Sequence, residues 1–121
     1  MLSYGIPYLT DESLSYLPEY AWNMHGGLSP QYKGAITHFW PSYLLEPQMT
    51  GVTLHQLTED LDGGGIIHEA AGPLERGDGL HQLACRVVKN FVDNELPRVL
   101  ELYEEGELCE PHSQQWHGKM W

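Results

Sequence analysis

The chain has 121 residues, of which 41% are hydrophobic and 19% are charged, as expected of one globular domain with a modest core. Six basic residues stand against 17 acidic ones, giving a formal net charge of −11, which argues against nucleic acid as a partner. Two cysteines without a CxxC pattern, no leader and no apolar run near 18 residues predict a cytoplasmic protein that does not span a membrane.

The first quarter of the chain is predicted to form short strands and loops. Residues 2–9 are aromatic and prone to strand formation but contain a glycine and a proline, so we expect the end of a strand and then a loop. Residues 10–17 begin with Thr-Asp, either of which can cap a short helix, and a proline follows it. The apolar run 20–24 predicts a brief buried strand before a Gly-Gly turn.

The middle of the chain is predicted to contain one helix and two strands. Residues 34–45 are apolar and aromatic, and we expect a helix there that ends before Pro47. Residues 51–57 alternate in the manner of a strand, and residues 66–71 form a returning strand. The glycine-rich stretch 62–65 is a turn within the excursion that joins them.

The longest helix is predicted to begin at Asp78, which can cap it. Pro97 should kink or restart the helix just before itself, and Gly106 should end the second stretch. Three- and four-residue spacing predicts an amphipathic helix with the apolar residues Leu80, Leu83, Ala84, Val87, Val88, Phe91 and Val92. Together with the short strands, this helix indicates an α/β fold.

Polar side chains suited to catalysis lie on the short buried strand and in the glycine-rich turn. Asn23 and His25 are two residues apart on an extended segment, so their side chains should point to the same side. Asp62 precedes three glycines, which let a backbone approach a ligand closely. An amide and an imidazole can stabilise an oxyanion, and a nearby carboxylate can set the protonation state of the imidazole. Taken singly, the three are also typical turn and loop residues.

Two segments together resemble the motifs of the folate-dependent formyltransferases, a family that includes glycinamide ribonucleotide transformylase, methionyl-tRNA formyltransferase and the sugar N-formyltransferases. The first family motif is Asn-x-His-x-Ser-Leu-Leu-Pro followed by a basic residue and glycine, and the second is Gly-x-Thr-x-His followed by Leu/Val-Asp-x-Gly. The sequence departs from the first at Gly27 and Ser29. The matching residues are Asn23, His25, Leu28, Pro30, Lys33, Gly34, Gly51, Thr53, His55, Leu61, Asp62 and Gly64.

The resemblance covers about residues 2–106 and leaves 107–121 as a tail. It implies a partial, Rossmann-like α/β fold in one domain over residues 1–121: a short mixed sheet with a long C-terminal amphipathic helix. The family's catalytic domains have further strands before the point that matches residue 2. The chain therefore resembles the second, C-terminal half of a catalytic domain, without the N-terminal strands.

The resemblance also implies a reaction and a site. The reaction is transfer of a formyl group from formyl-tetrahydrofolate to the primary amine of a small acceptor, such as a sugar nucleotide or a ribonucleotide. Asn23, His25 and Asp62 are the implied catalytic residues, Gly34 contacts substrate, and His55 has a structural role. Two loops clasp the folate, with the residues Ile6, Pro7, Tyr8, Leu9, Leu57, Thr58, Asp60 and Leu61.

Two other interpretations remain open from the sequence. A non-catalytic protein of this fold would self-associate, or pair with a chain that supplies the missing strands, because a half-sheet exposes an edge and an apolar face. A zinc site would need several of the histidines at 25, 38, 55 and 68, but the sequence has no HExxH and no close Cys/His pair. We therefore expect small-molecule substrates and no metal.

Overall fold

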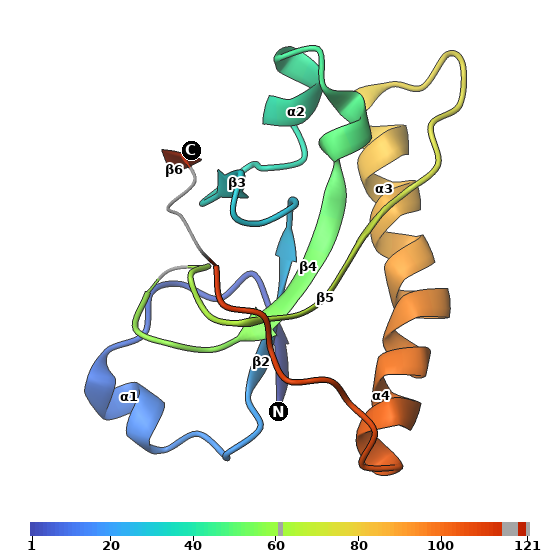
Figure 1. The fold of residues 1–121 in the computed structure, drawn as a ribbon. Coiled ribbons are helices and arrows are strands. Elements are labelled where there is room, and N and C mark those ends of the chain that lie inside the picture. The colour runs from blue at the N-terminus through green and yellow to red at the C-terminus, as the bar shows by residue number, and fades with distance from the viewer. Residues whose placement is uncertain (61, 115–118, 121) are drawn as a thin grey trace.

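The computed structural model describes residues 1–60, 62–114 and 119–120. A four-stranded sheet, several short helical turns and one long helix make up most of it (Figure 1). In chain order the elements are β1 (Leu2–Tyr4), α1 (Asp11–Ser15), β2 (Trp22–Gly26), β3 (Tyr32–Lys33), α2 (Trp40–Tyr43), η1 (Pro47–Met49), β4 (Gly51–Gln56), β5 (Ile66–Ala71), α3 (Leu80–Asn90), η2 (Phe91–Glu95), α4 (Leu96–Glu104) and β6 (Lys119–Met120).

The main sheet is mixed and has the strand order β1-β2-β4-β5. β1 runs parallel to β2, whereas β2 pairs antiparallel with β4 and β4 pairs antiparallel with β5. β3 and β6 form a separate parallel pair. The predicted α/β architecture, a short mixed sheet with a long C-terminal helix, is confirmed.

The core lies between the sheet and the long helix, which covers one face of the strands (Figure 1). Alternation along β2 and β4 directs one set of side chains toward the helix and leaves the other set for the opposite face. The helix contributes a stripe of apolar residues at regular spacing. The buried members are Trp22, Met24, Val52, Leu54, Leu83, Val87, Phe91, Leu96 and Val99.

A π-helical segment keeps this stripe in register along the whole helix. Leu83, Val87 and Phe91 follow one another at four-residue spacing, but the next buried residue is Leu96, five positions on. The wider turn of η2 absorbs the extra residue, so the apolar face stays against the sheet. It also places Pro97 in the first turn of α4, where its missing N–H is tolerated. The interruption of the helix predicted before Pro97 is therefore this π-helical segment.

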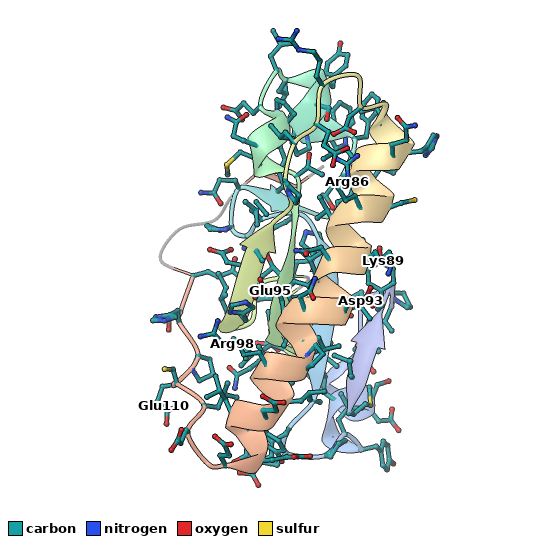
Figure 2. The ribbon with its side chains drawn as sticks, turned by 90° about the vertical axis from the view of Figure 1, so that its right-hand side faces the viewer. Arg86, Lys89, Asp93, Glu95, Arg98 and Glu110 are labelled. Atoms are coloured by element: carbon teal, nitrogen blue, oxygen red, sulfur yellow. The ribbon has the colours of Figure 1, made fainter. Side chains whose placement is uncertain are left out.

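The outer face of the helix is charged, as expected for an amphipathic helix at a surface. Figure 2 shows Arg86, Lys89, Asp93 and Arg98 along this face, and Lys89 pairs with Asp93 one turn later. Arg86 forms an ion pair with Asp78, which lies just before the helix. No described helix is long and apolar enough to cross a bilayer.

Two predictions about local structure are wrong. Residues 34–39 form a loop instead of helix, because Gly34 and Ile36 adopt left-handed φ angles of +97° and +57°, and only α2 remains helical. The residue that caps α3 is Gly79, whose N–H is satisfied by the side chain of Gln82, whereas Asp78 pairs with Arg86.

Candidate active site

Strand β2 carries two of the predicted catalytic side chains on the face of the sheet opposite the helix. Trp22 and Met24 pack in the core, so Asn23 and His25 point the other way. On the neighbouring strand β4, His55 is the register partner of Asn23. Asn23 is only 5% exposed, His25 6% and His55 2%. These polar side chains must therefore find their partners within the protein or in a ligand.

The connection between β4 and β5, residues 57–65, brings Asp62 to the same face. Asp62 adopts a left-handed φ of +51°, which aspartate tolerates better than most residues. A Cβ atom on Gly64 would lie 1.9 Å from the carbonyl oxygen of Gln56, so only glycine fits there. The close approach of the loop to β4 thus explains the glycine at position 64, within the stretch predicted as a turn.

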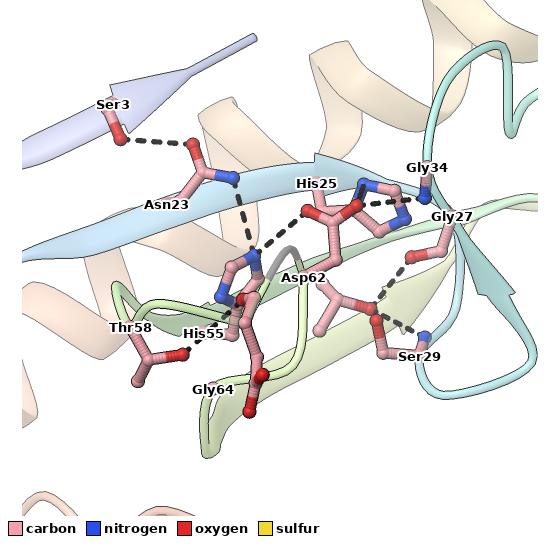
Figure 3. A network of polar contacts seen from close by, with 12 residues as sticks. Ser3, Asn23, His25, Gly27, Ser29, Gly34, His55, Thr58, Asp62 and Gly64 are labelled. Carbon is pink, nitrogen blue, oxygen red and sulfur yellow. Dashed lines mark hydrogen bonds and ion pairs between the residues drawn. The ribbon is translucent and has the colours of Figure 1, made fainter. Parts of the chain in front are cut away.

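The Asp62 carboxylate lies between two imidazoles (Figure 3). Its Oδ2 is 3.4 Å from Nδ1 of His25 and accepts the backbone N–H of Gly34 at 2.9 Å. Its Oδ1 is 3.5 Å from Nε2 of His55. The structure thus places Asp62 beside His25 although the two are far apart in sequence, and it adds Gly34 and His55 to the same cluster.

The hydrogen bond of His25 to the backbone determines which ring nitrogen carries the proton. Nε2 lies 2.5 Å from the carbonyl oxygen of Tyr32, which can only accept, so Nε2 is the donor. In the neutral ring, Nδ1 then holds a lone pair that faces the Asp62 carboxylate. A proton that arrives at Nδ1 is therefore stabilised by the adjacent negative charge.

Asn23 is held in one orientation by Ser3 and His55. Ser3 Oγ donates to Asn23 Oδ1 at 3.0 Å, and Asn23 Nδ2 lies 3.3 Å from His55 Nε2. His55 Nδ1 donates to the Gln56 carbonyl at 2.8 Å, so in the neutral ring Nε2 accepts from Asn23. One N–H of the Asn23 amide is used in this way, and the second is available to a ligand.

Burial and charge act in opposite directions on the two central ionisable groups. Burial lowers the pKa of His25 below 6.5 and outweighs the Asp62 charge, which raises it. Burial alone would raise the pKa of Asp62, but the neighbouring His55 and His25 rings and the Gly34 N–H together lower it below 3.8. The resting site therefore holds a neutral His25 beside an ionised Asp62. The family resemblance implies, in contrast, an Asp62 that supports a charged His25 and relays protons.

A cleft of about 570 Å³ opens over this cluster. Its walls include Asn23, His25, Asp62 and Gly34, together with residues 4–8 and 35–38. A substrate in the cleft would therefore contact all four of the residues predicted to act in catalysis or to contact substrate.

A second, narrower hollow adjoins the cleft on the side of the predicted folate loops. Its free volume is about 20 Å³, room for little more than a water molecule, so a pterin ring requires the loops to move apart. Leu61, which was also predicted to bind folate, lies outside the described residues. The other seven predicted folate residues all line the hollow: Ile6, Pro7, Tyr8, Leu9, Leu57, Thr58 and Asp60.

Of the four histidines considered as zinc ligands, His25 and His55 flank Asp62, and the other two have different partners. His38 bonds to the carbonyl of Gly51, and His68 pairs with Glu95 of η2 at 2.7 Å, on the helix side of the sheet. Within residues 1–60, 62–114 and 119–120, no three His, Cys, Asp or Glu side chains are grouped so that they could hold a metal ion.

One contributor to the site, Ser3, was missed in the sequence, and another, His55, has more contacts than its sequence position indicates. Ser3 received no role, although it is a hydroxyl between aromatic and apolar neighbours in a strand. Its parallel pairing with Asn23 puts both on one face of the sheet. His55 is predicted to have a structural role, and in the structure it contacts both Asn23 and Asp62. Strand alternation could have placed His55 opposite the core, because Val52 and Leu54 are apolar.

The family model described as formyl transferase matches residues 6–100 of this chain. The match includes the catalytic candidates Asn23, His25 and Asp62 and their neighbours Gly34 and His55, and it extends over more than half of the sequence.

Solved structures with the same fold are longer than this chain. The formyltransferase PseJ from Anoxybacillus kamchatkensis, in complex with UDP-4,6-dideoxy-4-formamido-L-AltNAc and tetrahydrofolate, is 24% identical, with a TM-score of 0.81, and 99% of this chain aligns with 62% of it. A 4-N formyltransferase from Francisella tularensis is 18% identical, with a TM-score of 0.80 and coverage of 99% and 48%. Glycinamide ribonucleotide transformylase 1 from Symbiobacterium toebii is 24% identical, with a TM-score of 0.72 and coverage of 90% and 51%. This chain thus spans less than two thirds of each.

Proposed function

Because the chain belongs to the formyl transferase family, we propose that it transfers a formyl group from formyl-tetrahydrofolate to the primary amine of a sugar nucleotide or another small acceptor. The observation that carries this proposal is the contact of Asp62 with His25 beside Asn23, on the wall of one cleft. Support for the two substrates comes from PseJ, solved with a UDP-linked formamido sugar and tetrahydrofolate, and from an N-formyltransferase of Helicobacter canadensis, solved with folinic acid and dTDP-3-aminofucose.

The arrangement of the side chains suits each step of such a transfer. The acceptor amine attacks the formyl carbon, a C–N bond forms, and the carbonyl oxygen becomes an oxyanion. The second N–H of Asn23 is the donor for that oxygen. The attacking amine loses a proton to the lone pair on Nδ1 of His25, where Asp62 stabilises it. The bond from carbon to the folate nitrogen then breaks, and the proton passes to that nitrogen.

The two loops at the narrow hollow are the proposed binding site for the pterin. Residues 6–9 and 57–60 face each other across it, and Tyr8 is 62% exposed, so the first loop has few contacts that resist its movement. Gly34 adjoins the acceptor side, where its N–H holds Asp62 and its missing side chain leaves the cleft open.

The proposal is tested by two substitutions, Asn23→Ala and His25→Ala, assayed with formyl-tetrahydrofolate and a UDP- or dTDP-linked amino sugar. We expect kcat to fall by about 10²–10³-fold while the dissociation constant for folinic acid, measured by calorimetry, changes only a few-fold. Asn94→Ala and His81→Ala are matched controls, since both residues are exposed on the long helix. Absence of folinic acid binding by the unaltered chain would refute the proposal.

A second candidate function is a non-catalytic protein whose sheet is completed by another chain. The free edge of β1 supports it. Among the described residues β1 is paired on one side only. Leu2 and Tyr4 share the face of Trp22 and Met24, yet the long helix does not cover them, and they are 44% and 57% exposed. Parallel strands are normally covered on both faces, so this corner of the sheet fits a further parallel strand with its helix.

The same corner contains an apolar groove of about 400 Å³, lined by residues of β1, β2 and α4 and by residues 18–20. If the purified chain supplies its own partner, it should sediment as a dimer or larger species at micromolar concentration. Leu2→Lys should then shift it toward the monomer, because a charge on an edge strand opposes pairing. Leu45→Lys, at an exposed leucine near η1, should not. A monomer throughout for the unaltered chain would contradict self-association.

A further inference from the structure

The segment after α4 returns across the sheet and joins the loop that carries Asp62 (Figure 1). Leu108 packs against the core, and His112 exchanges two backbone hydrogen bonds of 2.8 Å with Ile66, the first residue of β5. A Cβ atom on Gly65 would lie 2.8 Å from the Cβ of Pro111, so the returning segment is pressed closely against the loop. The sequence predicted only a tail here.

Within this returning segment, the side chain of Gln114 contacts the backbone of Asp62. Its Nε2 donates to the carbonyl oxygens of Asp62 and Gly64, both at 2.8 Å. Both acceptors are carbonyls, so only the amide nitrogen of Gln114 can lie there, and the orientation of this side chain is determined by chemistry. Its Oε1 is buried and has no hydrogen-bond partner among the described residues. The two donated hydrogen bonds hold the side chain in place against the loop.

The backbone at Asp62 needs such support. Its left-handed φ is less favourable than an extended or helical one, and the direction of its carboxylate follows from that backbone. Release of the Asp62 and Gly64 carbonyls would let the loop relax, and the carboxylate would then move from His25 Nδ1 and from the Gly34 N–H. Beyond Gln114, β6 pairs with β3, whose Tyr32 carbonyl accepts from His25, so the returning chain contacts both sides of the cluster.

We propose that Gln114 is a positioning residue of the active site, which holds the Asp62 loop so that the carboxylate reaches His25 and the Gly34 N–H. This inference rests on the proposed formyl transfer for its effect on rate, and on geometry alone for its effect on Asp62. Gln114 touches neither of the proposed catalytic side chains on β2 and acts through Asp62.

Gln114→Met tests the inference, because methionine keeps the length and neutrality of the side chain and removes both donors. We expect kcat to fall by about 10- to 100-fold with little change in KM for the acceptor. Gln114→Lys retains donors at this position and should recover most of the loss. Gln31→Met makes the same chemical change at an exposed glutamine and is the matched control, expected to match the unaltered chain.

A second readout does not depend on turnover. Asp62 raises the pKa of His25 against the effect of burial, so displacement of the carboxylate should lower the His25 titration midpoint further, as followed by NMR of its ring protons. In an Asp62→Asn background, Gln114→Met should add little to either readout, since residues that act through one group are not additive. Melting temperatures of all variants identify any that fail to fold, and the lysine variant then provides the comparison.

The outcomes separate this inference from the proposed function. A shifted His25 midpoint in a chain that transfers no formyl group would support the role of Gln114 and refute the reaction. Normal turnover in the unaltered chain, with kcat and the His25 midpoint both unchanged in Gln114→Met, would support the reaction and refute the role of Gln114. Full additivity of Gln114→Met with Asp62→Asn would also refute it.

Discussion

Replacement of Asp62 by asparagine is expected to lower kcat/KM for formyl transfer by about 10²–10⁴-fold. The substitution keeps the shape of the side chain and still permits acceptance of the Gly34 N–H, but it removes the charge that stabilises a proton on Nδ1 of His25. The loss should therefore appear in kcat, with folinic acid affinity nearly unchanged. Steady-state kinetics and calorimetry on the same samples measure the two separately.

The pH dependence of this variant follows from the sign of the interaction. Neutral His25 is the proton acceptor, and its pKa is lowered, so the acid limb of kcat/KM for the unaltered chain should have its midpoint below pH 6.5. Asp62 raises the pKa of His25, so Asp62→Asn should move that limb to still lower pH. The pKa of Asp62 is itself lowered, so the carboxylate stays ionised across this range.

Asp93→Asn is the matched control, since Asp93 is exposed on the long helix, and it should leave the rate and the limb unchanged. An Asp62→Asn variant within about threefold of the unaltered rate would show that the carboxylate has no part in proton transfer.

Phe91→Ala is expected to have the largest effect on stability, about 3–5 kcal/mol. Phe91 is 0% exposed and lies where α3 passes into η2, among the residues that attach the helix to the sheet. Truncation to alanine leaves a cavity between the helix and the sheet, and the surrounding side chains can fill it only in part. Such a loss is a large fraction of the stability of a typical domain, so much of the variant should be unfolded under mild conditions.

The measurement is urea denaturation followed by circular dichroism. Val92→Ala is the control: the neighbouring residue is 41% exposed, and its truncation should change the free energy of unfolding by about 0.5 kcal/mol or less. Equal effects of the two substitutions would mean that the apolar stripe does not run through Phe91.

The strands and helices that could be predicted are those whose apolar residues recur at a spacing that shows which face is buried. Alternation around residues 51–57 and the three- and four-residue spacing after Asp78 each describe one face against a core, and both elements are present. The helix predicted for 34–45 failed because apolar content was interpreted without backbone angles. The left-handed residue Ile36 breaks it, and no neighbouring residue marks that position.

The sequence by itself determined the two motifs, the four strands of the main sheet, the long helix, and the placement of Asn23 and His25 on one side of a strand. Each of these depends on residues close together in the chain. Only the tertiary structure decided that Asp62 meets His25 and His55, and that Gln114 holds the Asp62 backbone from 52 residues away. The physical reason is that such meetings are set by strand register, by the left-handed bend at Asp62 and by the path of the returning chain, none of which leaves a periodic trace in the sequence.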